Sequence, residues 1–354
     1  MTQPLRFILV GLGTMGSVWC RQTVPYLTGS LGAEFTAAVD PNEASHRHAI
    51  EAGLSPDSCY TDLRSALQQH NADFVISVVP PALHEGIVDL ALEFGCDILS
   101  EKPIADTLEA SCRIFHKVTA AGRKMAVTMS HRFDQDKQTL ERLIHSGKYG
   151  AVDSIIGRFS ADFRRFASWG KFRHEMEYPL LVEGAIHHFD ILRSLAGSNP
   201  KTLYAKSWKA DWGQYSGDSN TMVICEMENG VKTFFEGSKT SAATTNSWSQ
   251  EYFRAECDKA TLELSRREVT ARSSLGFPYP ELEVIPLAKQ TVWTNTWLAE
   301  LFVDWLRGGS IPPNSLEDNL QCTAMVFAAI ESARTGKEIH VPSFLHEYLA
   351  AAAE

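Results

Sequence analysis

Hydrophobic positions in the first third of the chain come in short unbroken runs, separated by segments with helical spacing. The runs, at 7–10, 35–39, 73–79, 98–99 and 125–129, are rich in β-branched residues, which predicts strands buried on both faces of a parallel sheet. The segments between them predict helices at 14–27, 42–53, 61–70, 83–94 and 107–121. Because strand and helix alternate, we expect an α/β domain with a doubly wound parallel sheet over residues 1–129.

The pattern changes near residue 130, where longer strand-like segments begin to dominate. A helix at 134–146 and a strand within GKYGAVDSIIGRFSADF are followed by predicted strands at 203–208, 221–227, 231–237, 251–257 and 260–265. Helices are predicted at 181–195, 294–306 and 316–335, and the final LAAAAE is predicted to be a fraying helix end. We therefore expect a second domain of the α+β type, with a mainly antiparallel sheet, over residues 130–354.

Three glycines follow the first predicted strand in the spacing G-x-G-x-x-G. Gly11 allows a tight turn, Gly13 allows the backbone to approach a pyrophosphate, and Gly16 allows close packing of helix on strand. Asp40 ends the second strand 24 residues after Gly16 (40 − 16), where an acid accepts hydrogen bonds from ribose hydroxyls. The alternative is a glycine turn in another α/β protein with a merely solvated Asp40. The complete order of strand, glycines, helix, strand and acid favours dinucleotide binding.

Further polar residues follow the other strands of the first domain. Pro80-Pro81 and Glu101-Lys102-Pro103 fall at carboxyl ends of strands, the edge at which ligands bind to such sheets. This places Lys102 near the predicted cofactor cleft, and Pro103 restricts its backbone. The alternative is a surface lysine that pairs with Glu101.

A second cluster lies in the segment VEGAIHHFDILRSLAG. On a helix, Glu183, His187 and Asp190 share one face, and a carboxylate beside an imidazole prepares a general base. The alternative is a core histidine with solvated acids, and His188 is expected to be structural. Weaker candidates for a polar-substrate pocket are Arg132, Asp162, Arg164, Arg165, Trp169 and Tyr178.

Composition narrows the classes of function. The chain has 354 residues, 44% of them hydrophobic, and a net charge of −10, which disfavours nucleic-acid binding. Seven scattered cysteines without a C-x-x-C predict reduced thiols and a cytoplasmic location. We expect no signal peptide and no membrane span. We also expect no metal site, since His46 and His48 lie on different sides of a predicted helix.

Several motifs together resemble the glucose–fructose oxidoreductase / inositol dehydrogenase / rhizopine-catabolism (Gfo/Idh/MocA) oxidoreductase family. They are GLGTMG, SVVPPALH, SEKPIA, HSGKYGAV, EGAIHHFDILRSLAG and ESARTGKEI, and they span almost the whole chain. The resemblance implies an N-terminal Rossmann domain and a C-terminal domain with a large open sheet. It also implies NAD(P)-dependent hydride transfer to or from a sugar, an inositol-like polyol or a sugar derivative, and assembly as a homodimer or homotetramer.

The resemblance assigns roles to individual residues. The family's lysine falls on Lys102 and its helix histidine on His187, so that His187 takes the hydroxyl proton while Lys102 positions the oxygen. Glu183 stands where the family often has Asp, which keeps the charge but lengthens the arm. Asp40 favours NAD, because a carboxylate repels a 2′-phosphate, although NADP stays possible. The residues expected to bind the cofactor are Gly11, Gly13, Thr14, Met15, Gly16, Asp40, Pro80, His84, Glu101 and Lys102.

Three other functions are compatible with similar residues. A glycoside hydrolase can use bound NAD by transient oxidation, and it differs in not consuming the cofactor in proportion to product. A non-catalytic dinucleotide sensor would not need both Lys102 and His187. Reduction of a non-sugar carbonyl or a linear tetrapyrrole fits less well with the many polar residues and the helix histidine.

Overall fold

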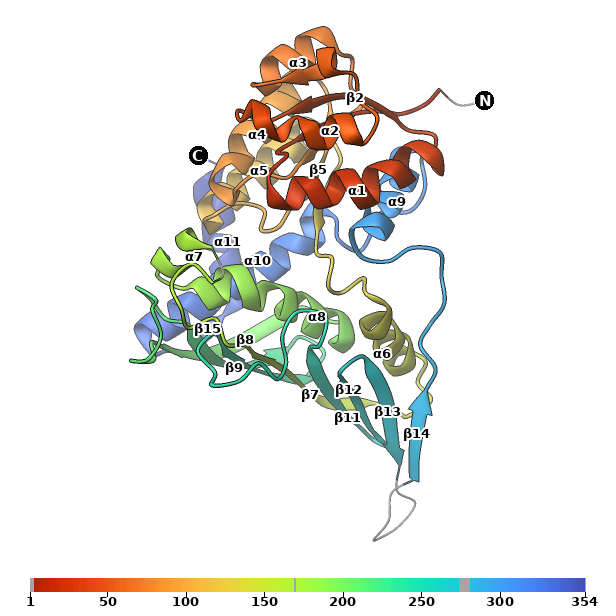
Figure 1. The fold of residues 1–354 in the computed structure, drawn as a ribbon. Coiled ribbons are helices and arrows are strands. Elements are labelled where there is room, and N and C mark those ends of the chain that lie inside the picture. Colours follow the sequence, from red (N-terminus) through yellow and green to blue (C-terminus); the bar gives the residue numbers. More distant parts are fainter. Residues whose placement is uncertain (1–2, 169, 274–280, 354) are drawn as a thin grey trace. The chain divides into compact units, whose positions relative to one another are not determined.

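The contacts within the chain divide it into two compact units. The computed structural model describes residues 3–168, 170–273 and 281–353 (Figure 1). The first unit comprises Met1–Ser130, Val292–Leu320 and Tyr348–Glu354, and the second comprises His131–Thr291 and Gln321–Glu347. We expected the domain boundary after residue 129, and the chain first passes from the first unit to the second one residue later, after Ser130. Two late segments that we expected in the second domain, Val292–Leu320 and Tyr348–Glu354, belong to the first unit instead.

The first unit contains a six-stranded, fully parallel sheet with the order β3-β2-β1-β4-β5-β6. Its strands are β1 (Arg6–Val10), β2 (Glu34–Val39), β3 (Cys59–Tyr60), β4 (Phe74–Ser77), β5 (Asp97–Glu101) and β6 (Met125–Thr128). The helices are α1 (Thr14–Gly29), α2 (Arg47–Glu51), α3 (Leu63–Gln69), α4 (His84–Glu93) and α5 (Leu108–Ala120). This order confirms the predicted doubly wound sheet, and the reversal between β1 and β4 is where such folds bind dinucleotides. The short β3 was not predicted.

The predicted helix over 42–53 is shorter in the structure. Asn42 caps a single 3-10 turn, Glu43–Ser45, by accepting a hydrogen bond from Ala44 N, and α2 follows as a separate helix. Gly53, with φ of +99°, lies in the left-handed region that only glycine adopts readily, so the helix ends before it.

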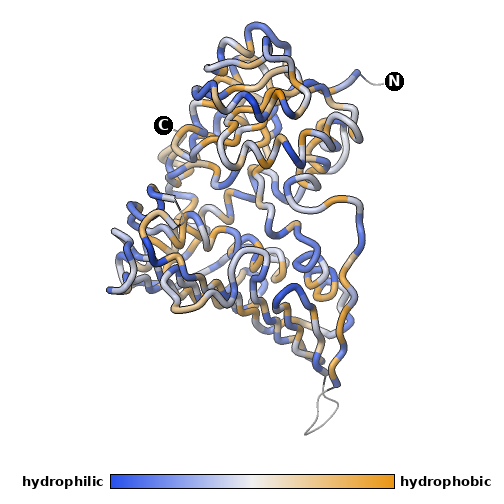
Figure 2. Tube along the Cα trace, viewed as in Figure 1, coloured by the Kyte–Doolittle hydropathy of each residue, from blue (hydrophilic) through white to orange (hydrophobic). Residues whose placement is uncertain are grey.

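The late helix α9 (Thr294–Leu306) explains why the chain returns to the first unit. Its Phe302 ring packs edge-on against Phe74 of β4 at 5.7 Å between centroids, and both side chains are fully buried. Thr296 Oγ1 also lies 3.2 Å from Thr23 Oγ1 of α1. The helix therefore covers apolar surface that the sheet would otherwise expose to water. Figure 2 shows hydrophobic and hydrophilic stretches alternating along the chain in this unit.

The second unit is built on a nine-stranded sheet with the order β14-β13-β12-β11-β7-β10-β9-β8-β15. Its strands are β7 (Val152–Ser160), β8 (Pro200–Trp208), β9 (Asn220–Met227), β10 (Lys232–Ser238), β11 (Tyr252–Cys257), β12 (Thr261–Ser265), β13 (Glu268–Ser273), β14 (Glu281–Ile285) and β15 (Ile339–His340). Among the described strands of this sheet, only β7 and β10 pair in parallel, so the mainly antiparallel sheet of the prediction is confirmed. Strands β13, β14 and β15 were not predicted.

Helices cover one face of this large sheet. They include α6 (Gln135–His145) and α8 (Ile186–Ala196), which pack on each other, with α8 against β7 and β10. Along β9 the side chains alternate, so that Val223 and Cys225 are buried while Met222 and Ile224 are 53% and 54% exposed. One face of the sheet is thus core, and the other presents apolar side chains outward.

The remaining helices are α7 (Lys171–Glu175), α10 (Leu316–Thr335) and α11 (Val341–Ala352). Helix α10 has the predicted bounds, whereas the tail expected to fray continues as helix α11 up to Ala352. Within the described ranges, none of the helices combines the length and apolar character that crossing a membrane requires.

Candidate active site

The glycine loop of the first unit has one open position between two tight ones. A Cβ on Gly11 would lie 2.3 Å from Val78 O, and one on Gly16 would lie 2.0 Å from Gly11 O, so neither position accepts a side chain. Gly13 is exposed and caps α1 without a side-chain hydrogen bond, and a Cβ there would meet no atom within 4 Å. The protein itself therefore needs Gly11 and Gly16, while Gly13 leaves room beside the helix start for a diphosphate. Thr14 and Met15 are exposed next to it.

The two kinds of glycine predict opposite outcomes for substitution. We expect Gly13→Ala to keep the melting temperature of the wild type and to weaken NAD binding about tenfold or more, because the new methyl group occupies ligand space. Gly16→Ala should instead lower the melting temperature, since its Cβ meets backbone that cannot move cheaply. Thermal unfolding and NAD titration on both variants test this. Normal NAD affinity in Gly13→Ala would contradict the role of that position.

Asp40, at the end of β2, supports the glycine loop directly. Its Oδ2 accepts a hydrogen bond from Leu12 N at 2.7 Å, and its Oδ1 accepts one from Asn42 N at 2.9 Å. Each carboxylate oxygen has a second lone pair, so these bonds leave acceptor capacity for ribose hydroxyls. His46 Nε2 lies 2.9 Å from the backbone oxygen of Asp40. Asp40 therefore shapes the loop, a supporting role that the sequence did not indicate, and its contact with the ribose stays a prediction.

His84 and Pro80 occupy different environments at the neighbouring strand end. Pro80 is exposed, but His84 has no exposed surface. The His84 ring lies between two loops, with Nδ1 at 2.9 Å from Pro103 O and Nε2 at 2.9 Å from Val79 O. Burial lowers the pKa of this imidazole. His84 can thus support a cofactor only through the loops that it joins.

Glu101 is the last residue of β5 and Lys102 follows it; both are half-buried. Glu101 Oε1 accepts a hydrogen bond from Trp19 Nε1 of α1 at 2.9 Å, and its Oε2 accepts a long one from Lys102 N at 3.4 Å. The Lys102–Pro103 peptide bond is cis. Glu101 thereby ties the first helix of the unit to the segment that carries Lys102, and this contact favours a supporting role for the carboxylate.

In the second unit, Glu183 and His187 lie on either side of a change in helix type. Leu181–Ala185 form a π-helical turn, and α8 starts at Ile186, so the expected i,i+4 spacing on a continuous α-helix is altered. Such turns occur often at functional sites. Glu183 is 3% exposed and accepts hydrogen bonds from Arg173, whose Nε and Nη2 lie 2.9 and 2.8 Å from Oε2. His187 is 6% exposed, and its Nδ1 is buried.

The neighbours of His187 on α8 have different partners. Asp190 accepts a hydrogen bond from Arg132 Nη1 at 3.1 Å, and both side chains are buried. His188 is fully buried beside the rings of Phe159 and Phe253, and burial lowers its pKa to about 4. A neutral histidine among aromatic rings is a core residue, which agrees with the structural role expected for His188.

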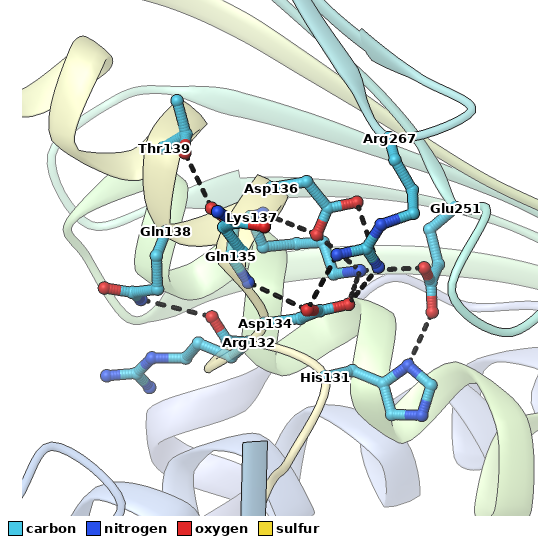
Figure 3. Close-up of polar contacts among 10 residues, drawn as sticks. All are labelled: His131, Arg132, Asp134, Gln135, Asp136, Lys137, Gln138, Thr139, Glu251 and Arg267. Atoms are coloured by element: carbon cyan, nitrogen blue, oxygen red, sulfur yellow. Dashed lines mark hydrogen bonds and ion pairs between the residues drawn. The ribbon is translucent and has the colours of Figure 1, made fainter. Parts of the chain in front are cut away.

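Sequence reasoning missed the imidazole that contacts His187. The ring of His131 lies 4.2 Å from that of His187 between centroids, and its Nδ1 hydrogen-bonds to the carboxylate of Glu251 (Figure 3). Trp248 packs against both rings, at 5.1 and 5.8 Å. The only local signal for His131 is its position directly after a predicted strand end; Glu251 lies 120 residues further along the chain.

Part of the predicted polar-substrate pocket exists as a separate cavity. A hollow of about 580 Å³ is lined by Asp162, Arg164, Arg165, Ser168, Trp212 and Gln214. The Arg164 guanidinium forms a bidentate pair with Asp162, with Nε 2.8 Å from Oδ1 and Nη2 2.9 Å from Oδ2. Of the other weaker candidates, Arg132 forms the buried pair with Asp190 described above. Tyr178 is half-buried, and burial raises the pKa of its hydroxyl. Trp169 lies outside the described residues.

Comparisons with known proteins agree with this architecture. Residues 5–129 match a family model described as an oxidoreductase family with an NAD-binding Rossmann fold, and residues 138–263 match the GFO/IDH/MocA C-terminal domain. The first unit is thus an NAD-binding domain of the oxidoreductase class. A sequence relative in Sinorhizobium fredii (strain NBRC 101917 / NGR234), the uncharacterized protein y4oX, is 42% identical over 96% of both chains. The chain belongs to the Gfo/Idh/MocA oxidoreductase family.

Relatives with assigned activities are more distant. The inositol 2-dehydrogenase of Corynebacterium glutamicum (strain R) is 30% identical over 65% of this chain and 66% of its own length. An oxidoreductase of Agrobacterium radiobacter, solved with NAD+, L-tartaric acid and magnesium, aligns with a TM-score of 0.84 at 18% identity, covering 96% of this chain and 99% of its own. An inositol dehydrogenase homologue of Azotobacter vinelandii, solved with NADH and myo-inositol, aligns with a TM-score of 0.78 at 18% identity, covering 96% of this chain and 98% of its own. At such identities the two structures support the fold alone.

Proposed function

We propose that the protein is an NAD-dependent dehydrogenase or reductase that acts on a CH–OH group of a sugar, an inositol-like polyol or a sugar derivative. The observation that carries the proposal is a combination of three features. Gly13 leaves the nucleotide loop of the first unit open. The half-buried Lys102 and the nearly buried His187 stand at the positions where the family has its catalytic pair. The inositol 2-dehydrogenase relative supports a polyol-like substrate.

The residues of the first unit fit an NAD cofactor. The unfilled space at Gly13 and the uncapped start of α1 suit the diphosphate, and the Asp40 carboxylate suits the adenosine ribose. When bound, the nicotinamide supplies the hydride acceptor or donor. Among the other predicted contacts, Thr14, Met15 and Pro80 are exposed enough to touch it, while Glu101 and His84 act as supports.

Two side chains would handle the substrate hydroxyl in the direction of oxidation. His187 accepts its proton at Nε2, because Nδ1 is buried. Lys102 donates a hydrogen bond from Nζ to the same oxygen and stabilises the negative charge that develops there. Glu183, paired with Arg173, positions the helix turn that precedes His187. In the direction of reduction the proton returns from His187 to the oxygen.

A substrate screen tests the proposal. Wild type is mixed with NAD+ or NADP+ against a panel of sugars, inositols and sugar acids, and the near-ultraviolet absorbance of the reduced nicotinamide is followed. We expect absorbance to grow with one class of polyol or sugar. A flat trace in a protein that binds NAD would contradict a dehydrogenase, and product analysis on glycosides would then test the hydrolase that keeps its NAD bound.

The cofactor preference depends on Asp40. We expect Asp40→Ala to weaken NAD binding about 10- to 100-fold, because ribose acceptors and the support of Leu12 N are both lost. The ratio of NADP to NAD affinity should rise, since the carboxylate no longer repels a 2′-phosphate. Titration of both cofactors measures this, with Asp57→Ala as an acidic control on an exposed turn. An unchanged affinity ratio would contradict the ribose role.

We also propose that the protein assembles as a homodimer or homotetramer in the cytoplasm. The outward apolar side chains of β9, Met222 and Ile224, suit contact with a second copy. The cysteines of the described residues form no disulfide, which is compatible with a reducing compartment.

A further inference from the structure

A buried polar network of the second unit ends at the imidazole that contacts His187. Glu251 and Lys137 have side chains that are 0% and 1% exposed, and Lys137 Nζ lies 3.0 Å from Glu251 Oε2. Lys137 is held in turn by Asp134 at 3.2 Å and Asp136 at 2.9 Å (Figure 3). The other carboxylate oxygen of Glu251, Oε1, bonds to Nδ1 of His131.

The network determines which nitrogen of His131 carries a proton. Burial alone would raise the pKa of Glu251, but the interactions with His131 and with the Lys137 ammonium outweigh burial and hold that pKa well below its usual range. An ionised carboxylate only accepts hydrogen bonds, so Nδ1 of His131 must be the donor. This fixes both the tautomer and the plane of the ring, as a carboxylate does for the imidazole of a catalytic triad.

The fixed ring of His131 is in direct contact with His187. Their centroids are 4.2 Å apart with an interplanar angle of 41°, and Trp248 packs against the edges of both rings. Lys239 lies on Trp248 as well, with Nζ 4.8 Å from the ring centroid. The side chain of His131 is 20% exposed, so the network reaches the surface of its unit beside His187.

Stability alone is a weak reason for this arrangement. Desolvation of buried ion pairs costs about as much as their attraction returns, and apolar side chains of similar volume are often as stable or more stable. A buried polar network holds its members in one geometry where they are paired, as Glu251 is with His131 and Lys137, and this benefits a site whose groups must be aligned closely.

We propose that His131 and Glu251 are positioning residues for His187, with Glu251 fixing the His131 ring and that ring fixing the orientation of His187. The proposal rests on the proposed function, in which His187 exchanges a proton with the substrate hydroxyl. His131 transfers no atom to the substrate. Its effect is to keep Nε2 of His187 directed at the reacting oxygen.

Two substitutions separate positioning from stability. Glu251→Gln and Asp136→Asn each remove one buried carboxylate from Lys137, but only Glu251 contacts His131. We expect Glu251→Gln to lower kcat about 10- to 100-fold with KM nearly unchanged, the usual cost of losing a residue that orients a catalytic ligand. Asp136→Asn should lower the melting temperature comparably and leave kcat within about threefold. Glu251→Asp, which keeps the charge, should recover part of the lost kcat.

A second measurement does not depend on activity. Nitrogen chemical shifts of the histidine rings, recorded by NMR on the cofactor-free protein, report the tautomer of each imidazole. We expect Glu251→Gln to change the ring signals of both His131 and His187, and Asp136→Asn to leave them as in the wild type. If Glu251→Gln folds too poorly to measure, His131→Asn carries the same expectation for the His187 signals.

The outcomes distinguish this inference from the proposed function. If His187→Asn abolishes turnover while Glu251→Gln matches Asp136→Asn in kcat and in the His187 signals, the positioning role is overturned and the proposed function stands. If His187→Asn leaves turnover intact, another group accepts the proton and the positioning role is overturned with it, while the dehydrogenase stands. If the wild type turns over no substrate in the screen, the proposed function fails; His187 ring signals that change in Glu251→Gln but not in Asp136→Asn would then still support the fixing of His187 by His131. Changes in kcat and in the His187 signals that are specific to Glu251→Gln would support the positioning role.

Discussion

Replacing Lys102 by alanine is expected to lower kcat by about 100- to 10,000-fold, while the affinity for NAD changes only a few-fold. The reason is that Nζ would stabilise charge on the substrate oxygen only as the proton leaves, whereas the dinucleotide is held mainly by the glycine loop and Asp40. Initial rates with the substrate identified in the screen, together with NAD titration, measure the two quantities on the same preparation.

The matched control for Lys102 is Lys117→Ala. Lys117 is a partly exposed lysine of the same unit, on α5, that pairs with Glu85 and Asp89. Its loss should leave both turnover and NAD affinity as in the wild type, because surface ion pairs contribute little. Near-normal turnover in Lys102→Ala would remove the proposed mechanism. A parallel collapse of NAD affinity would instead move Lys102 from chemistry to cofactor binding.

Replacing His187 by asparagine is expected to lower kcat by about 100- to 10,000-fold as well, since the group that accepts the hydroxyl proton is lost. Asparagine keeps a polar side chain of similar reach, so the nearly buried position is not left as a cavity. NAD binding should be unaffected, because the predicted dinucleotide contacts lie in the other unit. Turnover, NAD titration and thermal unfolding on one preparation check the three expectations.

His145→Asn serves as the control for His187. His145 is an exposed histidine at the end of α6, and its replacement should change none of the three measurements. Retained turnover in His187→Asn, with His145→Asn also normal, would show that another group accepts the proton. Loss of thermal stability in His187→Asn alone would indicate that the histidine is mainly a core residue, which is the alternative that the sequence left open.

Several features of the site were predictable because the information is local in the chain. The spacing of Gly11, Gly13 and Gly16 follows from one turn between one strand and one helix, and Asp40 ends the next strand. The alternation of strands and helices likewise predicted the parallel sheet. The different roles of the glycines became visible only in three dimensions, where Val78 O blocks a Cβ on Gly11, while a Cβ on Gly13 would meet none of the described atoms beyond its own chain neighbours within 4 Å.

The partners of the polar residues were not predictable in the same way. The sequence placed Glu183 and Asp190 beside His187, and the structure provides them with Arg173 and Arg132. Helical spacing predicts which residues share a face, but it does not predict the π-helical turn at Leu181–Ala185 or which cations come from other segments. A buried carboxylate needs a cationic partner, and which cation lies close enough to pair with it depends on how distant segments pack together.

By itself, the sequence determined the class of both sheets and the order of strand, glycines, helix, strand and acid in the first unit, and the roles that it predicts for these residues and for Lys102 and His187 stay predictions. The tertiary structure decided that His84 joins two loops, that α9 returns to the first unit, and that His131, held by Glu251, lies against His187. The physical reason is the range of the interactions. Strand, helix and turn signals act over a few residues, whereas these contacts join segments up to hundreds of residues apart, whose meeting depends on how the whole core packs.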